Sequence, residues 1–423
     1  MVRKILQAKL RLIAWLVVRK HSPLVIAITG SVGKTGTKDA VIKIVSDNGY
    51  RVRGTSGNYN NEIGVPLTII GSTSGGSSWL SWFLIILKGV RMVLIPAAYP
   101  DVLVLEMAAD RPGDIGYLAK IAPPDIAIVT AISSVHLEFF KSVESVATEK
   151  GSLLQYLKSN GTAILNADDK RVLDLKSRYH KKFLTYGIIS KSDVQANNIA
   201  LVYDKDPHLK AIVLAHAQQC SLILPNFIAR HHLYGILAAI SAGIALKIPL
   251  SNIVLSLKDL TPPKGRMTIL PGVKHTTIID DSYNSSPQAA VEALNTLKQL
   301  AARRKTIAVL GDMLELGSYT QKAHFELGHT LAKLKITDLI TVGEKATDIA
   351  QGAIKAGMSK SKIFSFDNAP AAGRFLQDRM RQGDFILIKG SQGVRTEKIV
   401  KEVMANPEKA KDLLVRQGPE WQS

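Results

Sequence analysis

The sequence predicts an α/β protein in which two domains each contain a mostly parallel, doubly wound sheet. Three observations support this fold class. Short apolar strands alternate with amphipathic helices from Leu24 onward, a proline pair interrupts the series near residue 262, and a second series of the same kind follows. A chain of 423 residues is also too long for a single ordinary hydrophobic core.

The first α/β series lies between residues 24 and 260. Its predicted strands are residues 25–29, 102–106, 126–130 and 162–165, and its predicted helices are residues 35–46, 113–121, 143–159 and 171–178. Residues 194–224 differ, because short β-rich segments alternate there with turn residues and predict an antiparallel addition. An alanine-rich helix over residues 229–246 then closes the series.

The best domain boundary is the segment from Thr261 to Gly265, which contains Pro262 and Pro263. Two prolines fix an extended backbone and cannot continue the preceding helix. The strands predicted beyond them are residues 276–279, 306–310, 338–342, 362–365 and 385–388. We therefore expect a basic N-terminal helix in residues 1–23, a central domain in residues 24–262 and a Rossmann-like domain in residues 263–423, without internal repeats.

The composition limits the possible partners. The formal net charge of +19 implies attraction to anions such as a nucleotide, a phosphorylated substrate or an anionic membrane surface. No signature of a nucleic-acid-binding module is present, so we expect no nucleic-acid partner. The single cysteine, Cys220, excludes an internal disulfide framework and a cysteine-based metal site, and it is compatible with a reducing cytoplasm.

Two apolar segments raise the question of membrane contact. The first twenty residues alternate basic and apolar side chains without an acidic one. Their charges exclude a membrane span, and no cleavage site of a signal peptide follows. A helix on a membrane surface and a helix packed on the next domain remain equally open. Residues 79–96 are also too short to span, and here a buried or surface-seated helix is favoured over membrane contact.

The strongest local signal is a glycine-containing turn between the strand at residues 25–29 and the next helix. The turn runs from Thr29 to Thr35 and reads Thr-Gly-Ser-Val-Gly-Lys-Thr. Such a turn presents backbone N–H groups and the positive end of a helix dipole to phosphate oxygens. Lys34 would bridge the β- and γ-phosphates, and the Thr35 hydroxyl would bind Mg²⁺. The motif is a shortened P-loop, with Ile28 where the standard spacing has glycine. It favours ATP binding, although a chance match stays possible.

This turn resembles the TGxxGKT motif of the Mur ligase superfamily, and further blocks follow in the family's order. The similarity extends from about residue 25 to residue 403 and is strongest to the MurF type, which adds D-alanyl-D-alanine. The matching blocks are Gly57–Leu67, Val104–Ala108, His136 with its neighbours, Lys150 in Thr-Glu-Lys-Gly, Asn166–Asp169, Gly265–Met267, Asp280–Pro287, Gly311–Gly317 and Lys389–Arg395. Individually these blocks are weak or moderate, but collinear blocks are a strong signal.

The resemblance implies a role for each matching residue. Lys34, Lys150, His136 and Arg266 would be catalytic, and the metal ligands would be Thr35, Glu106, His136 and a carbamylated Lys150. The nucleotide would contact Thr29, Gly30, Ser31, Val32, Gly33, Lys34, Thr35, His232, Arg266 and Asp281. The substrates would contact Asn58, Asn60, Asn61, Asn284 and Lys389. Closure of the two domains would bring Arg266 to the γ-phosphate.

Each of these roles has an alternative in ordinary structure. His136 can be a structural histidine, because imidazole is an unusual ligand of magnesium. Lys150 alone would be read as a solvated helix charge, and Arg266 as a surface ion pair. Asp281 and Asn284, together with Asp280, can cap the helix that follows them.

The sequence departs from the family pattern twice. The phosphate turn begins at residue 30, so we expect the family's N-terminal domain for the UDP-sugar to be missing, with only a basic helix in its place. The acceptor would then be held by another surface, or be lipid-linked and presented at a membrane. The family also offers asparagines to adenine at the start of one helix, whereas this chain has His232 and Gly235. Recognition of the base should therefore differ.

The resemblance implies an ATP- and Mg²⁺-dependent ligase that forms an amide bond through an acyl phosphate. The expected substrates are a muramoyl-peptide carboxylate and D-alanyl-D-alanine or a similar amine, used in peptidoglycan precursor synthesis. We expect a cytoplasmic monomer, with peripheral contact to the inner face of the membrane through residues 1–20 and 79–96 as an option. Two alternatives remain: the same chemistry on a folylpolyglutamate-like, poly-γ-glutamate-like or lipid-linked acceptor, or a non-catalytic nucleotide-binding scaffold at the membrane.

Overall fold

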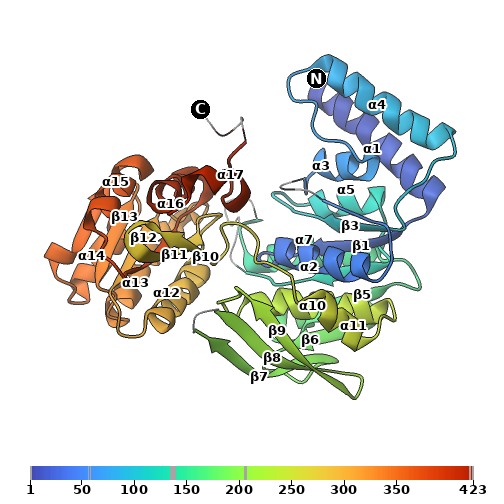
Figure 1. Cartoon of the computed structure of the whole chain (residues 1–423). Helices are drawn as coiled ribbons and strands as arrows, with labels where there is room; N and C mark the ends of the chain where they lie inside the picture. Colours follow the sequence, from blue (N-terminus) through green and yellow to red (C-terminus); the bar gives the residue numbers. More distant parts are fainter. Residues whose placement is uncertain are drawn as a thin grey trace. The chain divides into compact units, whose positions relative to one another are not determined.

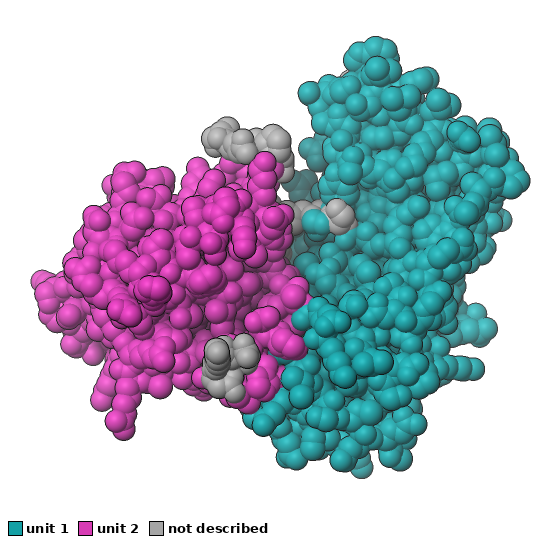
Figure 2. Space-filling model, viewed as in Figure 1, with its two compact units in different colours: residues 1–200, 210–224, 230–260 teal, residues 201–209, 225–229, 261–423 magenta. Residues whose placement is uncertain are grey.

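The computed structural model describes residues 2–55, 57, 59–133, 140–203, 207–418 and 421. The chain forms two compact units, coloured separately in Figure 2. Unit 1 contains residues 1–200, 210–224 and 230–260, and unit 2 contains residues 201–209, 225–229 and 261–423. The main division therefore follows Leu260, next to the proline pair, while two short segments of the expected central domain belong to unit 2.

Unit 1 is built on a nine-stranded sheet with the strand order β2-β3-β1-β4-β5-β6-β7-β8-β9. Neighbouring strands from β2 to β7 run parallel. The strands are β1 (Leu24–Thr29), β2 (Val52–Gly54), β3 (Val102–Glu106), β4 (Ile126–Val129), β5 (Thr162–Asn166), β6 (Lys182–Gly187), β7 (Val194–Val202), β8 (His208–Ala215) and β9 (Gln218–Pro225). Strands β3, β4 and β5 are buried at every position, because a parallel sheet is covered on both faces.

Helices cover this sheet as a doubly wound fold requires (Figure 1). On one side α2 (Lys34–Asp47) packs against α10 (His232–Ala245) and α11 (Leu250–Ser256). On the other side α1 (Val2–His21) packs against α3 (Gly64–Ile70), α4 (Trp79–Leu94) and α5 (Asp114–Ile121). The carboxyl ends of β1 and β3 lie side by side, with Ile28 opposite Glu106. This edge of the sheet is where open α/β folds bind their ligands.

The β-rich stretch after residue 194 continues the sheet. A two-residue turn at His216 and Ala217 joins β8 to β9, and both residues have positive φ values of 46° and 63°. Such a turn matches the twist of a β-hairpin, so the two strands run antiparallel as the sequence predicts.

Two predicted helices are wrong in length. The helix expected over residues 143–159 ends early, as α7 (Val143–Gly151), and continues as a 3₁₀ segment, Ser152–Tyr156. The helix expected over residues 171–178 is divided into α8 (Lys170–Leu173) and α9 (Leu175–Arg178). In the second case the side chain of Asp169 accepts hydrogen bonds from backbone N–H groups at the start of α8, which begins the helix earlier.

Unit 2 contains a six-stranded sheet with the order β10-β11-β15-β12-β13-β14. The edge strand β10 is antiparallel to β11, and the other pairs are parallel. The strands are β10 (Thr268–Gly272), β11 (Thr276–Asp281), β12 (Thr306–Gly311), β13 (Asp338–Val342), β14 (Ile363–Phe366) and β15 (Phe385–Lys389). The helices are α12 (Pro287–Ala301), α13 (Thr320–Lys333), α14 (Thr347–Lys355), α15 (Ala369–Arg379), α16 (Glu397–Val403) and α17 (Ala410–Leu413). Ile228 and Ala229 belong to the core of this unit and are fully buried. Together the two sheets confirm the predicted α/β class.

The N-terminal helix α1 is part of the core of unit 1. Leu10, Ala14 and Val17 have no exposed surface, and they join the hydrophobic cluster on this face of the sheet. Of the two alternatives for the first twenty residues, packing on the adjacent domain is therefore present. In the part of the chain that the structure describes, no helix is long and apolar enough to cross a membrane.

Candidate active site

The turn between β1 and α2 has a backbone that only glycine can adopt at two positions. Gly30 has a φ of 145° and Gly33 has a φ of 88°, both outside the range that other residues favour. A Cβ atom on Gly30 would lie 2.0 Å from the Oγ1 atom of Thr130. Gly33 precedes Lys34, the first residue of α2, so the N–H groups of this helix start are directed into the turn.

Hydrogen bonds fix the shape of this turn. The Nζ atom of Lys34 donates to the carbonyl oxygen of Gly30 at 2.7 Å. The hydroxyl of Thr130, which follows β4, donates to the carbonyl oxygen of Val32 at 2.6 Å. The backbone N–H of Ser133 donates to the Oγ atom of Ser31 at 3.0 Å. The lysine ammonium is thus folded back over a turn that is already formed, where it can meet phosphate oxygens without a large rearrangement.

A buried carboxylate lies beside the start of α2. Glu106 ends β3 and is 3% exposed. One of its oxygens accepts a hydrogen bond from the Thr35 hydroxyl at 3.1 Å, and the other accepts one from the Asn60 side-chain amide at 3.1 Å. Neither donor is charged, so these contacts leave the negative charge of the carboxylate uncompensated. The sequence-predicted pair of Thr35 and Glu106 is therefore brought together, and Asn60 joins it.

These oxygens fit a magnesium ion. Magnesium prefers hard oxygen ligands, and it usually binds through one or two protein groups together with water and substrate phosphates. The Thr35 hydroxyl and the Glu106 carboxylate offer such a donor set next to the phosphate turn. Among the described residues, no group of three or more His, Cys, Asp or Glu side chains could hold a metal ion.

Lys150, at the end of α7, is a buried lysine rather than a solvated one. It is 2% exposed. Burial, and then the positive charge of Lys34, lower the pKa of the Lys150 amine to about 7, although Glu149 and Asp110 oppose the shift. A large fraction of this amine is therefore neutral near neutral pH. Glu149 itself accepts hydrogen bonds from the N–H groups of Gly113 and Ile115 and so caps the start of α5.

The segment Asn166–Asp169 stabilises the phosphate turn indirectly, through the residues that follow β4. The carboxylate of Asp169 accepts a hydrogen bond from the N–H of Ile132 at 2.8 Å, and the side chain of Asn166 donates to the carbonyl oxygen of Thr130. Both contacts fix the segment that follows β4. This segment includes Thr130, whose hydroxyl donates to the phosphate turn. Sequence reasoning named this segment without a role and missed Thr130, whose only signal was its position at the end of a predicted strand.

The expected base-binding helix starts close to the phosphate turn. His232 is the first residue of α10. A Cβ atom on Gly235 would lie 3.1 Å from the Oγ1 atom of Thr37 and 3.7 Å from the carbonyl oxygen of Gly33. The glycine thus has a packing reason, because it allows α10 to approach the first turn of α2. The role of His232 toward a nucleotide base stays a prediction.

The asparagines of the expected substrate loop have different surroundings. Asn60 contacts Glu106, as described above. The side-chain oxygen of Asn61 accepts hydrogen bonds from the N–H groups of Ile63 and Gly64 at 3.2 and 2.9 Å, and it therefore initiates α3. Asn58 and His136 lie outside the described residues.

Unit 2 contains a second group of predicted site residues. The guanidinium carbon of Arg266 lies 4.1 Å from the centre of the Tyr283 ring, which holds the side chain by a cation–π contact. The buried ammonium of Lys389 forms an ion pair with Asp281 at 2.6 Å and donates to the carbonyl oxygen of Asn284 at 3.0 Å. The structure therefore brings Asp281, Asn284 and Lys389 together at the carboxyl ends of β11 and β15.

Asp280, next to this group, is a fully buried acid. Burial raises the pKa of its carboxyl group to about 6, and the negative charges of Asp281 and Glu397 add to the shift. The backbone N–H of Ser282 donates to one carboxyl oxygen at 3.1 Å, which offsets part of the effect. The folded state consequently favours the protonated acid, whereas the ordinary pKa of an unfolded aspartate is 3.8.

This raised pKa predicts how two neighbouring substitutions differ. The stability contribution of Asp280 is complete below the unfolded pKa and is lost as the pH rises through about 6. Asp280→Asn should therefore increase the free energy of unfolding by about 1–2 kcal/mol at about pH 8, and the gain should be much smaller at about pH 4. Asp281→Asn should decrease it at about pH 8, because it leaves the buried Lys389 ammonium without its counter-ion. Urea titrations at both pH values measure the effects; equal gains from Asp280→Asn at both would contradict the assignment.

Two protein-family models match consecutive parts of the chain. The model described as the Mur ligase middle domain matches residues 90–243. These residues belong to unit 1, except for the two short unit 2 segments at residues 201–209 and 225–229. The model described as the Mur ligase, glutamate ligase domain matches residues 265–392 in unit 2. The two matches follow each other in the order expected for one enzyme.

Similar proteins cover most of the chain. It is 29% identical over 385 residues to the UDP-N-acetylmuramoyl-tripeptide–D-alanyl-D-alanine ligase of Bacillus subtilis (strain 168), covering 90% of this chain and 76% of that relative. MurF from Acinetobacter baumannii has a TM-score of 0.77 at 25% identity, covering 93% of this chain and 79% of that one. MurF ligase from Thermotoga maritima in complex with ADP has a TM-score of 0.76 at 27% identity, covering 94% of this chain and 83% of that one. Because both domain types match in sequence, and the fold matches over nearly the whole chain, the protein belongs to the Mur ligase family.

Proposed function

We propose that this protein is an ATP- and Mg²⁺-dependent ligase that joins D-alanyl-D-alanine to a muramoyl-peptide carboxylate in peptidoglycan precursor synthesis. The observation that carries the proposal is the contact between Thr35, on the phosphate turn, and the buried Glu106. This contact places oxygen atoms that suit a metal ion beside a turn that suits phosphate, in a chain whose relatives include D-alanyl-D-alanine ligases.

The reaction requires an activated carboxylate. The acceptor carboxylate attacks the γ-phosphorus of ATP, the bond to the β-phosphate oxygen breaks, and an acyl phosphate and ADP result. The amine then attacks the carbonyl carbon, inorganic phosphate leaves, and the nitrogen loses a proton. Phosphoryl transfer depends mainly on alignment and charge neutralisation. The N–H groups at the start of α2 and the ammonium of Lys34 would supply both, and bound magnesium would add neutralisation at the oxygens of Thr35 and Glu106.

Lys150 is proposed to act as a carbamate. Carbamylation requires a neutral amine, whose nitrogen bonds to the carbon of CO₂ and releases a proton, giving an anion in place of a cation. The lowered pKa of Lys150 favours the neutral form. The nearby positive charge of Lys34 would favour the anionic product, whereas burial opposes a charge of either sign at this position. The role of His136 as a further metal ligand stays part of the proposal by resemblance alone.

Unit 2 is proposed to complete the site. Arg266 carries a fixed planar fork of donors that suits the γ-phosphate, and its stacking on Tyr283 supports a defined orientation. Asp281, Asn284 and Lys389 would contact the nucleotide ribose or the incoming amine. In this proposal residues 24–262 form the ATP-binding domain and residues 263–423 the amine-binding ligase domain. The enzyme would act as a cytoplasmic monomer, with membrane contact as an added property.

Mass spectrometry of reaction products tests the function. Purified protein is incubated with ATP, Mg²⁺, D-alanyl-D-alanine and a muramoyl tripeptide, and ADP release is followed in parallel. The expected product has the mass of the tripeptide plus D-alanyl-D-alanine minus water, with one ADP released for each bond. Product only with a polyglutamate-type acid would replace the substrate, and absence of ADP release with every acceptor would favour a non-catalytic scaffold.

A further inference from the structure

Helix α4 exposes a continuous apolar surface. Its outer side chains recur every three or four residues, which places them on one face of the helix. Trp79 and Leu94, near its two ends, are 79% and 74% exposed. The apolar stripe, as we name this surface, consists of Trp79, Leu80, Phe83, Leu84, Leu87, Val90, Leu94 and the adjoining Ile95.

The opposite face of α4 is fixed to α1. Ile85 and Gly89 are buried there, and a Cβ atom on Gly89 would lie 2.4 Å from the Cγ2 atom of Ile13. The ammonium of Lys20 donates to the carbonyl oxygens of Met92 and Ile95 at 3.1 and 2.9 Å. The apolar stripe therefore belongs to a helix held firmly in place. A helix that is apolar around most of its circumference is normally buried or in contact with lipid.

The charges on α4 and on α1 beside it are basic, and Glu62 of a neighbouring segment pairs with Arg3 at the start of α1. Lys88 and Arg91 are the only ionisable residues between Trp79 and Ile95, and α1 beside α4 carries six lysine and arginine residues and no acidic one. Such a combination of apolar and basic residues is typical of helices that lie in the interface of an anionic membrane. The helix has 16 residues, too few to span a bilayer, so it would lie flat.

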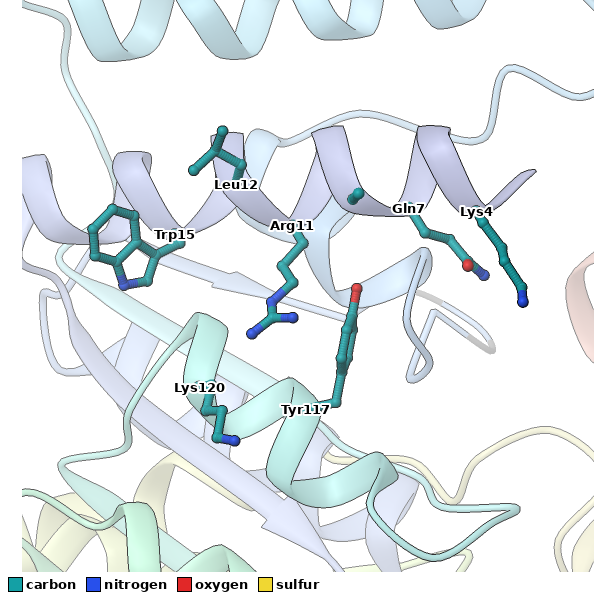
Figure 3. A pocket seen from close by; sticks show the side chains of 8 residues that line it. Lys4, Gln7, Arg11, Leu12, Trp15, Tyr117 and Lys120 are labelled. Atoms are coloured by element: carbon teal, nitrogen blue, oxygen red, sulfur yellow. The ribbon is translucent and has the colours of Figure 1, made fainter. Parts of the chain in front are cut away.

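A basic hollow lies on the other flank of α1. Its volume is about 640 Å³, and it opens between α1 and α5 (Figure 3). Arg11 and Tyr117 extend into the space between the two helices, and the Arg11 guanidinium lies 4.6 Å from the centre of the Tyr117 ring. Lys120 also lines the hollow, and its ammonium lies 5.7 Å from the centre of the Tyr156 ring. Lys4 and Trp15 also line the hollow. Cations next to aromatic rings suit a phosphate group attached to an apolar chain.

We propose that α4 docks the enzyme on an anionic lipid surface, where the apolar stripe enters the interface and the basic hollow binds lipid phosphates. A membrane is favoured over a protein groove because the charged residues of α4, Lys88 and Arg91, are both cations that suit lipid phosphates, and α4 lies at the outer edge of unit 1 (Figure 1). Membrane docking would bring the ligase to an acceptor presented at the membrane. The proposal concerns binding alone and does not depend on the ligase activity.

Flotation with lipid vesicles tests the proposal. The full chain is mixed with vesicles of phosphatidylcholine alone or of phosphatidylcholine with phosphatidylglycerol, without nucleotide. Wild-type protein should float with the anionic vesicles. The double variant Phe83→Glu/Leu87→Glu should need about tenfold more lipid or greater, because two large apolar side chains no longer enter the interface. Arg11→Glu/Lys120→Glu should lose the preference for anionic vesicles.

A matched control uses exposed apolar residues elsewhere in unit 1. Ile189 and Leu255 are 76% and 60% exposed, so Ile189→Glu/Leu255→Glu should bind like the wild type. The proposal would be overturned if Ile189→Glu/Leu255→Glu lost as much vesicle binding as Phe83→Glu/Leu87→Glu. It would also be overturned if the wild type did not float. Gel filtration that shows a dimer broken by Phe83→Glu/Leu87→Glu would overturn it as well, since the stripe would then cover a second copy. Deleting residues 1–20 is unsuitable as a test, because it removes the fully buried Leu10 and Val17 from the core.

Discussion

Lys34→Ala should lower the rate of acceptor-dependent ADP release by about a thousandfold or more, because charge neutralisation dominates catalysis of phosphoryl transfer. The Lys34 ammonium lies 2.7 Å from the carbonyl oxygen of Gly30, at the mouth of the phosphate turn. Alanine retains the helix and the turn but removes the cation that we assign to both the β- and the γ-phosphate. Steady-state kinetics and calorimetric titration with ADP would separate the loss of turnover from the loss of binding.

The control for this variant lies on the same helix. Lys43 pairs with Asp47 at 2.7 Å on the partly exposed side of α2, away from the turn. Lys43→Ala should retain activity within about twofold, since surface ion pairs contribute little. If Lys34→Ala retained more than about a tenth of wild-type turnover, the proposed use of this turn in phosphoryl transfer would be wrong.

Glu106→Gln should lower turnover by about a hundredfold or more and raise the Mg²⁺ concentration needed for half-maximal rate. The substitution keeps the size of a side chain that is 3% exposed but removes its charge. Glutamine can still accept a hydrogen bond from Thr35, whereas its amide nitrogen cannot accept one from Asn60. The measurement is the dependence of ADP release on Mg²⁺ at saturating ATP.

A double-variant cycle distinguishes a shared metal site from general damage. Thr35→Val alone should also raise the Mg²⁺ requirement, and the pair Thr35→Val/Glu106→Gln should cost less than the sum of the two effects, since both residues serve one site. The control Glu144→Gln, an exposed carboxylate at the start of α7, should leave the Mg²⁺ dependence unchanged. Strictly additive losses in kcat with no change in Mg²⁺ dependence would contradict the metal assignment of Glu106.

The parallel core of both units could be predicted because its sequence signal is local. Strands β3 and β13 were predicted at their full length, since a strand buried on both faces is a continuous apolar run. The phosphate turn was equally accessible, because Gly30 and Gly33 mark backbone conformations that other residues avoid. Short edge strands such as β2 and β10 lack such a run and were missed.

The remaining features depend on contacts that are distant in sequence. A lysine on a helix gives no sign of burial, yet Lys150 is buried and its pKa is lowered partly by Lys34, more than a hundred positions earlier. The solvent exposure of the apolar stripe on α4 could not be predicted from the sequence either, because buried and exposed apolar segments have the same composition. The alternatives for residues 1–20 were separated by tertiary packing, which buried Leu10 and Val17.

Ile228 and Ala229 have a consequence for dissecting this enzyme. Both are fully buried in the core of unit 2, although they precede its main segment by more than thirty positions. A recombinant fragment that starts at Thr261 would lack these side chains, leaving uncovered apolar surface and a tendency to aggregate. Residues 261–423 alone are therefore an incomplete folding unit, and isotope labelling or crystallisation of unit 2 needs a fusion that restores residues 225–229.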